Sequence, residues 1–173
     1  MKIALVYDRV NKWGGAERVL LALHEIFPDA PLFTAVYSSE KAKWAKIFPK
    51  VIPSFLQKIR FTNTNHEFLG AFTPLAFESF DFDGYDMVIS VTSEAAKGII
   101  TKPGTLHICY CHTPTRYFWS HRHSYIEDLP YPRVLRSLLP GMLSRMRRWD
   151  RLAADRPDVY VAFLTNSSNG MPP

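Results

Sequence analysis

The stretch from Cys109 to Trp119 holds the densest group of side chains that could do chemistry. It includes His112, whose imidazole titrates near neutral pH, and Arg116, whose guanidinium can hold a phosphate through two hydrogen bonds. Trp119 and Tyr117 add flat rings on which a sugar or a base could stack. We therefore expect this stretch to bind a ligand that carries phosphate and a ring.

The same stretch raises the question of a metal site, since four potential ligands lie close together: His107, Cys109, Cys111 and His112. Structural zinc sites usually take their cysteines from a turn with C-x-x-C spacing, whereas these residues belong to one predicted strand. We therefore expect no metal here. A disulfide between cysteines two apart on a strand is also geometrically unfavourable, so we expect free thiols.

Two adjacent glycines, Gly14 and Gly15, form a second candidate site at the start of a predicted helix. The free N–H groups and the dipole of a helix start attract anions, although a plain tight turn explains the glycines equally well. The pattern matches neither the dinucleotide-binding fingerprint nor the P-loop. Glu17 falls in the first turn of that helix, where its carboxylate either offsets the dipole or accepts hydrogen bonds from ligand hydroxyls.

A third feature is the predicted helix over residues 133–156, which carries arginines beside an apolar stripe. These are Arg133, Arg136, Arg145, Arg147, Arg148 and Arg151. They form either a solvated face or a surface that adheres to an anionic membrane through Arg145, Arg147 and Arg148. The net charge of +5 suits an anionic partner. No known RNA- or DNA-binding motif is present, so we expect no nucleic-acid partner.

Apolar runs and helical periodicity predict which elements position these residues. We expect buried strands over 3–7, 32–37, 85–91, 107–111 and 159–164. We expect helices over 16–27, 39–48, 55–61, 67–80, 92–98 and 133–156, the last kinked or split at Pro140-Gly141. This alternation predicts an α/β fold: an open, mostly parallel Rossmann-like sheet with helices on both faces. The loops 8–17, 92–97 and 112–119 should then meet at the carboxyl edge, where ligands bind.

The length of 173 residues and 47% hydrophobic content predict one packed domain over residues 1–164, followed by a polar tail over 165–173. The first apolar run is too short for a signal peptide, and no run approaches the 18 residues of a membrane span. We expect a cytoplasmic protein, with peripheral contact to the inner face of the plasma membrane as an option.

Three segments resemble family 4 glycosyltransferases of the GT-B fold: residues 2–7, residues 14–20 and residues 110–119. The resemblance is greatest to bacterial mannosyltransferases of O-antigen and exopolysaccharide assembly. It implies a Rossmann-like N-terminal domain that binds the acceptor, a sugar or a lipid-linked oligosaccharide. It also implies transfer with retention of anomeric configuration and without a bound metal.

The resemblance further implies roles for individual residues. Gly14 and Gly15 would lie near the diphosphate of the donor, and His112 would contact the donor sugar near the reacting carbon as the catalytic residue. Glu17, Arg116 and Trp119 would contact the acceptor.

One departure from the family is large. The second Rossmann-like domain, which holds the nucleotide and carries two glutamates seven residues apart, has no counterpart in these residues. We therefore expect no cofactor, a nucleotide-sugar such as GDP-mannose bound only together with that domain, and no transferase activity from this chain alone. A partner chain could supply the domain. The alternatives are a non-catalytic Rossmann-like module that docks on membranes or anions, and an unrelated Rossmann-like enzyme.

Overall fold

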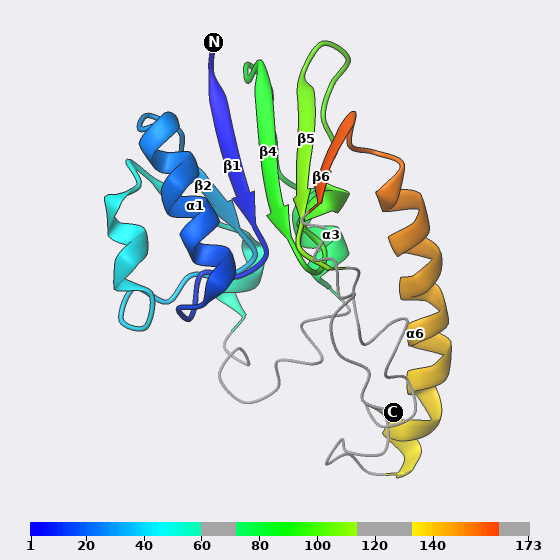
Figure 1. Ribbon diagram of the computed structural model, residues 1–173. Helices are drawn as coiled ribbons and strands as arrows, with labels where there is room; N and C mark the ends of the chain where they lie inside the picture. The colour runs from blue at the N-terminus through cyan, green and yellow to red at the C-terminus, as the bar shows by residue number, and fades with distance from the viewer. Residues whose placement is uncertain (60–71, 114–132, 163–173) are drawn as a thin grey trace, which may run out of the picture.

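The sheet has six parallel strands in the order β3-β2-β1-β4-β5-β6 (Figure 1). The computed structural model describes residues 1–59, 72–113 and 133–162, with only the backbone described for 133–139. The strands are β1 (Ile3–Tyr7), β2 (Leu32–Thr34), β3 (Val51–Pro53), β4 (Met87–Thr92), β5 (Leu106–Cys111) and β6 (Val159–Ala162). β1 pairs with both β2 and β4, so the chain builds the sheet outward in two directions from its first strand.

Helices cover both faces of this sheet, as the sequence predicted. The α-helices are α1 (Gly15–Ile26), α3 (Thr73–Glu78) and α6 (Arg133–Ala154), and single 3-10 turns form η1 (Lys43–Ile47), η2 (Phe55–Lys58) and η4 (Ala96–Gly98). One core lies between the sheet and α1, and the other lies on the opposite face with α3, η4 and α6. The predicted fold class, an open Rossmann-like parallel sheet, is therefore confirmed.

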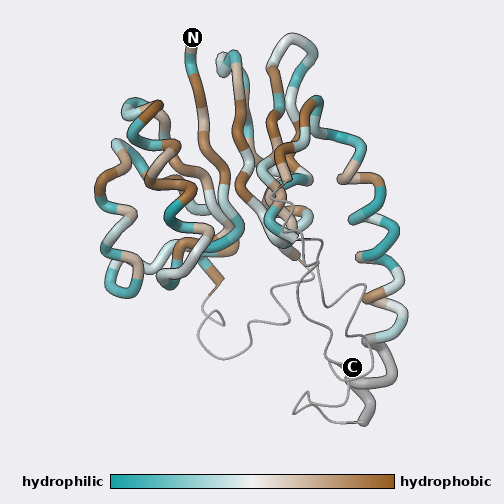
Figure 2. The backbone as a smooth tube through the Cα atoms, in the orientation of Figure 1, coloured by the Kyte–Doolittle hydropathy of each residue, from teal (hydrophilic) through white to brown (hydrophobic). Residues whose placement is uncertain are grey.

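The central strands are apolar on both sides because both of their faces are covered. In β1, Ala4 and Val6 enter the core of α3, while Leu5 and Tyr7 enter the core of α1. The hydropathy colouring shows brown along β1, β4 and β5, with teal in the connections (Figure 2). Burial on both faces produces short continuous apolar runs rather than alternation, which is why these strands can be read from the sequence.

Helix α6 is locked onto the sheet by an unusually close contact. A Cβ at Gly98 would lie 2.3 Å from the ring of Trp149, so only glycine fits beneath this indole. Beside it, Lys97 and Asp150 form a buried ion pair of 2.6 Å. The Trp149 indole N–H donates to Glu78 Oε1 at 2.7 Å. Shape and charge together therefore fix α6 against η4 and α3.

Several predicted elements differ from the observed ones. The helices expected over 39–48 and 92–98 are reduced to the 3-10 turns η1 and η4. Of the kink or split expected at Pro140-Gly141, the split does not occur, since α6 is one helix that continues through Pro140. The second strand ends at Thr34 instead of residue 37. Strand β3 was not predicted; it ends in Pro53 and lies at the sheet edge, where a residue without an N–H is tolerated. In the described ranges, no helix combines the length and hydropathy that a bilayer crossing requires.

Candidate active site

The candidate site lies at the carboxyl edge of the sheet, between the ends of β1 and β4. These strands are neighbours, and from each of them the sheet extends outward in the opposite direction. Ligands of open parallel sheets bind at such a switch point.

Asp8, the first residue after β1, fills a cradle of backbone N–H groups in the loop after β4. Its carboxylate accepts hydrogen bonds of 2.7–3.0 Å from the N–H groups of residues 93–96. The Thr92 hydroxyl also donates to it, at 2.9 Å. Successive N–H groups that converge on one point form an anion-binding nest. Here the anion is a side chain of the protein, so this nest is already occupied.

An ion pair between Arg9 and Glu94 joins the same two loops at the surface. Burial raises the pKa of the Glu94 carboxyl, the nearby charge of Asp8 raises it further, and Arg9 lowers it. Together with the Asp8 cradle, the pair holds the loop after β1 against the loop after β4.

Glu17 lies on the α1 side of this edge and is almost fully buried, with 1% of its surface exposed. The Tyr7 hydroxyl donates to Glu17 Oε1 at 2.9 Å. Burial, followed by this hydrogen bond, raises the pKa of the Tyr7 hydroxyl, so it stays a donor. The other carboxylate oxygen lies below the glycine turn: a Cβ at Gly14 would be 3.1 Å from it, whereas a Cβ at Gly15 would have no neighbour within 4 Å. The two glycines therefore have different surroundings.

His112 directly follows β5, and the charges of the Asp8 and Glu17 carboxylates act on its ring. Its backbone N–H donates to the Thr92 carbonyl at 3.0 Å, and its ring contacts that of Tyr110 edge-on, with the centroids 5.1 Å apart. Its Nε2 atom is buried, and the described residues offer it no hydrogen-bond partner. Burial lowers the pKa of His112, while Asp8 and Glu17 act against this. The ring is therefore mostly neutral at pH 7 and can form one more hydrogen bond at Nε2.

The side chains of His107, Cys109 and Cys111 lie on the face of β5 opposite to Tyr110, and they are not placed for catalysis. His107 Nε2 shares a hydrogen bond of 2.9 Å with the Ser90 hydroxyl, and burial lowers the His107 pKa to about 4. Burial raises the pKa of the Cys109 thiol to about 11, and both cysteines are free. Such a thiol is neither a nucleophile nor a ready metal ligand at neutral pH. Within the described ranges, no three His, Cys, Asp or Glu side chains are grouped as a metal would need.

The structure brings four of the predicted site residues to one edge of the sheet: Gly14, Gly15, Glu17 and His112. Arg116 and Trp119 lie outside the described residues, as do the expected tail over 165–173 and the segment after residue 162. Arg145 and Arg148 are exposed on α6, whereas Arg147 is half-buried. The loops 8–17 and 92–97 meet at this edge as the sequence predicted, but Tyr7, Asp8 and the Arg9–Glu94 pair were not singled out. Polar residues directly after a buried strand are the signal that could have identified Asp8.

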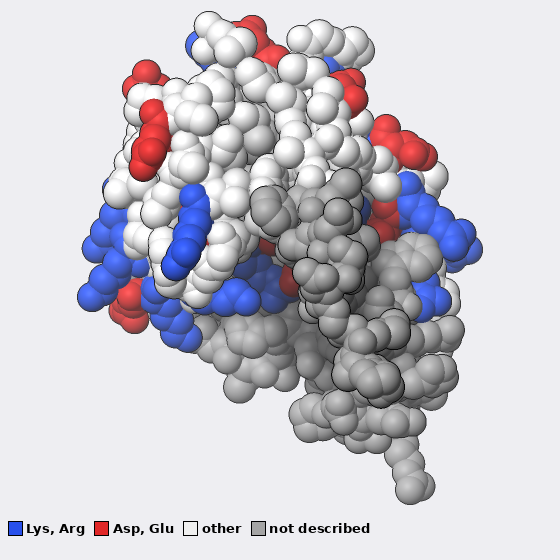
Figure 3. Space-filling model, in the orientation of Figure 1, with Lys and Arg blue, Asp and Glu red and all other residues white. Residues whose placement is uncertain are grey.

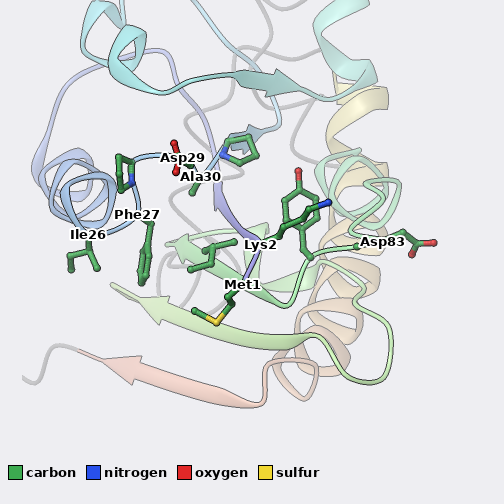
Figure 4. A pocket seen from close by; sticks show the side chains of 12 residues that line it. Met1, Lys2, Ile26, Phe27, Asp29, Ala30 and Asp83 are labelled. Atoms are coloured by element: carbon green, nitrogen blue, oxygen red, sulfur yellow. The ribbon is translucent and has the colours of Figure 1, made fainter.

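A separate hollow of about 670 Å³ lies at the opposite edge, near the amino ends of the strands (Figure 4). Ile26 and Phe27 line it on the side of α1, and Met1, Lys2 and Asp83 line the rest of its rim. Because ligands of open parallel sheets bind at the carboxyl ends, this hollow is not part of the candidate active site.

Comparison of the chain with protein-family models, with curated proteins and with solved structures gives no match. The proposals below therefore depend on the geometry and on the motif resemblance.

Proposed function

We propose that this chain is the acceptor-binding half of a retaining glycosyltransferase, which transfers a sugar from a nucleotide-sugar to a lipid-linked or oligosaccharide acceptor. The observation that carries the proposal is His112, whose buried Nε2 lacks a partner among the described residues at the edge where ligands of such sheets bind. If the likeness to bacterial mannosyltransferases extends to the substrate, the sugar is mannose and the donor is GDP-mannose.

A neutral histidine beside two carboxylates suits the chemistry of sugar transfer. As the bond to the leaving group breaks, the reacting carbon gains positive charge. A cationic side chain would repel that charge, but the lowered pKa keeps His112 mostly neutral at pH 7. Its Nε2 can then hydrogen-bond a hydroxyl of the sugar, while the charges of Asp8 and Glu17 favour the developing cation. His112 is the catalytic residue of this proposal.

The glycine turn and Glu17 complete the proposed site. The open space at Gly15 would let the donor's diphosphate approach the first N–H groups of α1. Glu17 would contact the acceptor through the carboxylate oxygen next to Gly14, with Arg116 and Trp119 as further acceptor contacts. The nucleotide would be held by a second domain, either in the same protein or in a partner chain, and the proposal involves no metal.

The test is sugar transfer by the chain combined with a nucleotide-sugar-binding domain of a GT-B mannosyltransferase. Labelled GDP-mannose and a lipid-linked saccharide serve as substrates. We expect transfer that falls at least a hundredfold in kcat with His112→Ala. His24→Ala is the matched control, because His24 packs on Phe48 within the α1 core, and it should change kcat less than twofold. Equal rates for His112→Ala and the unmodified chain would overturn the proposal.

A second candidate function, membrane docking without catalysis, is favoured by one surface of α6. Arg145 and Arg148 are exposed one turn apart, and Leu152 one turn further is 67% exposed. A basic and apolar stripe of this kind suits an anionic leaflet. Arg147 contributes less, since it is half-buried. Co-sedimentation with phosphatidylglycerol vesicles that is abolished by Arg145→Glu with Arg148→Glu, but not by Lys50→Glu, would support this function.

A further inference from the structure

Trp13, the residue before the glycine turn, presents a large aromatic surface beside the candidate active site. It is 51% exposed although it is one of only four tryptophans in the chain. It precedes Gly14, the N-cap of α1, and so lies at the same edge of the sheet as Glu17. A half-exposed indole at this edge offers a large apolar ring to a ligand that binds there.

The indole of Trp13 is also held in place. Its ring meets that of Trp44 at 62°, with the centroids 6.0 Å apart. Trp44 is fixed in turn, because its indole N–H donates to the Lys12 carbonyl at 2.8 Å and its ring packs on Phe48. The edge contact and the exposed half of Trp13 leave ring surface available to a ligand. Such a preorganised aromatic plate loses little conformational entropy when a ligand stacks on it.

Positive charge surrounds this plate. Residues 38–47 contain three lysines and one glutamate, and Lys43 directly precedes Trp44. The cations on this side of the molecule are all exposed: Lys12, Arg18, Lys41, Lys43 and Lys46. Figure 3 shows Lys and Arg side chains gathered here, over the start of α1 and the segment that holds η1. A ligand that stacks on Trp13 therefore lies near several exposed cations, whereas the carboxylates of Asp8 and Glu17 at this edge are buried.

We infer that Trp13 forms an acceptor subsite for an anionic saccharide, a sugar ring that bears a phosphate or a carboxylate. The C–H groups on one side of a pyranose stack on the exposed indole, and Lys12 and Lys43 attract the negative group. This inference rests on the proposed function and deepens it, since it states the chemical class of the acceptor. Two independent features carry it: the fixed exposed ring and the surrounding cations.

The test is a titration of the isolated chain, followed by two-dimensional amide NMR, with four probes. Glucose 6-phosphate and galacturonate carry ring and charge, methyl glucoside carries the ring alone, and inorganic phosphate carries the charge alone. We expect the first two to bind at least fivefold more tightly than the others. Trp13→Ala should weaken them at least fivefold, while Trp13→Phe, which keeps an aromatic plate, should stay within twofold. Lys12→Ala with Lys43→Ala should remove the preference over methyl glucoside.

The outcomes separate this inference from the proposed function. Equal binding by Trp13→Ala and the unmodified chain, or binding of inorganic phosphate as tight as that of glucose 6-phosphate, would overturn the subsite. So would the absence of any binding at 20 mM probe, on the order of the weakest specific sugar affinities. The transfer assay with His112→Ala is independent of Trp13, so the proposed function would stand or fall separately. Circular dichroism of each variant excludes unfolding as the cause.

Discussion

Two buried carboxylates, Asp8 and Glu17, lie at the same edge of the sheet, yet their surroundings differ. Asp8 accepts hydrogen bonds from four backbone N–H groups and from the Thr92 hydroxyl. Among the described residues Glu17 accepts one hydrogen bond, from Tyr7, and its other oxygen lies below Gly14. The charges of both carboxylates act on His112, whose Nε2 atom is unpartnered in the described structure.

The difference separates a residue that builds the edge from residues that can act there. Asp8 satisfies four backbone N–H groups and the Thr92 hydroxyl, so its carboxylate has little left to offer a ligand. Glu17 and His112 keep unused hydrogen-bonding capacity beside a glycine turn. We therefore expect ligand binding and catalysis to involve Glu17 and His112, and we expect Asp8 to stabilise the loop before η4.

The largest expected effect comes from neutralising each carboxylate in turn. Asp8→Asn places an amide N–H group among donors and removes a charge that several hydrogen bonds depend on. We expect it to lower the free energy of unfolding by about 4 kcal/mol or to prevent folding. Glu17→Gln keeps an oxygen for the Tyr7 hydroxyl and should cost about 1 kcal/mol. Urea unfolding followed by circular dichroism measures both.

A milder variant keeps this comparison testable if Asp8→Asn does not fold. Thr92→Val removes one donor to Asp8 and should cost about 1–2 kcal/mol. A loss larger for Glu17→Gln than for Thr92→Val or Asp8→Asn would reverse the comparison.

The pH dependence of stability has a contribution from His107 that must be separated from those of Asp8 and Glu17. His107 has a pKa of about 4 in the folded chain, against about 6.5 when unfolded. The unfolded chain therefore binds a proton first, and stability is full above pH 6.5 and falls as the pH decreases toward 4. The total loss is about 3 kcal/mol. Unfolding in urea between pH 7.5 and 5 should show this slope, and His107→Gln should flatten it. An unchanged slope in His107→Gln would assign the pH dependence to other groups.

The smallest effects distinguish the two glycines on the Glu17 side. Gly14→Ala places a methyl group 3.1 Å from a Glu17 carboxylate oxygen and should cost about 1 kcal/mol. Gly15→Ala meets open space at the first helical position and should be neutral or stabilising by about 0.5 kcal/mol. Thermal unfolding of the two variants makes the comparison. If Gly14→Ala costs nothing, Glu17 is mobile enough to move away.

The sheet could be predicted from the sequence because its strands are buried on both faces. Residues 3–7 are apolar throughout, and residues 87–91 are apolar except for the buried Ser90. Short runs of this kind are typical of central parallel strands that are covered on both faces. The short turns η1 and η4 could not be predicted as such. In η4, the backbone after Ser93 is held by Asp8, so the capping pattern that suggests a helix is overridden by a distant contact.

The candidate site was only partly accessible from the sequence for the same reason. Gly14, Gly15 and His112 stand in recognisable motifs, and their place at the ends of strands follows from the alternation of elements. The position of Asp8 directly after a buried strand marks it as a candidate, but its partner Thr92 lies 84 residues later in the chain and is brought to it only by folding. The ring of Trp13 is held in place by Trp44, and the sequence does not predict that these two residues are in contact.

Asp8 also determines whether the loop after β4 must become ordered when a ligand binds. The loop after β4 is fixed when the chain folds, because four of its amides already bind an internal anion. The conformational entropy of that loop is lost during folding and not during binding. A ligand that binds at this edge therefore meets a loop after β4 that is already ordered. Any conformational change on binding must come from the other segments at this edge.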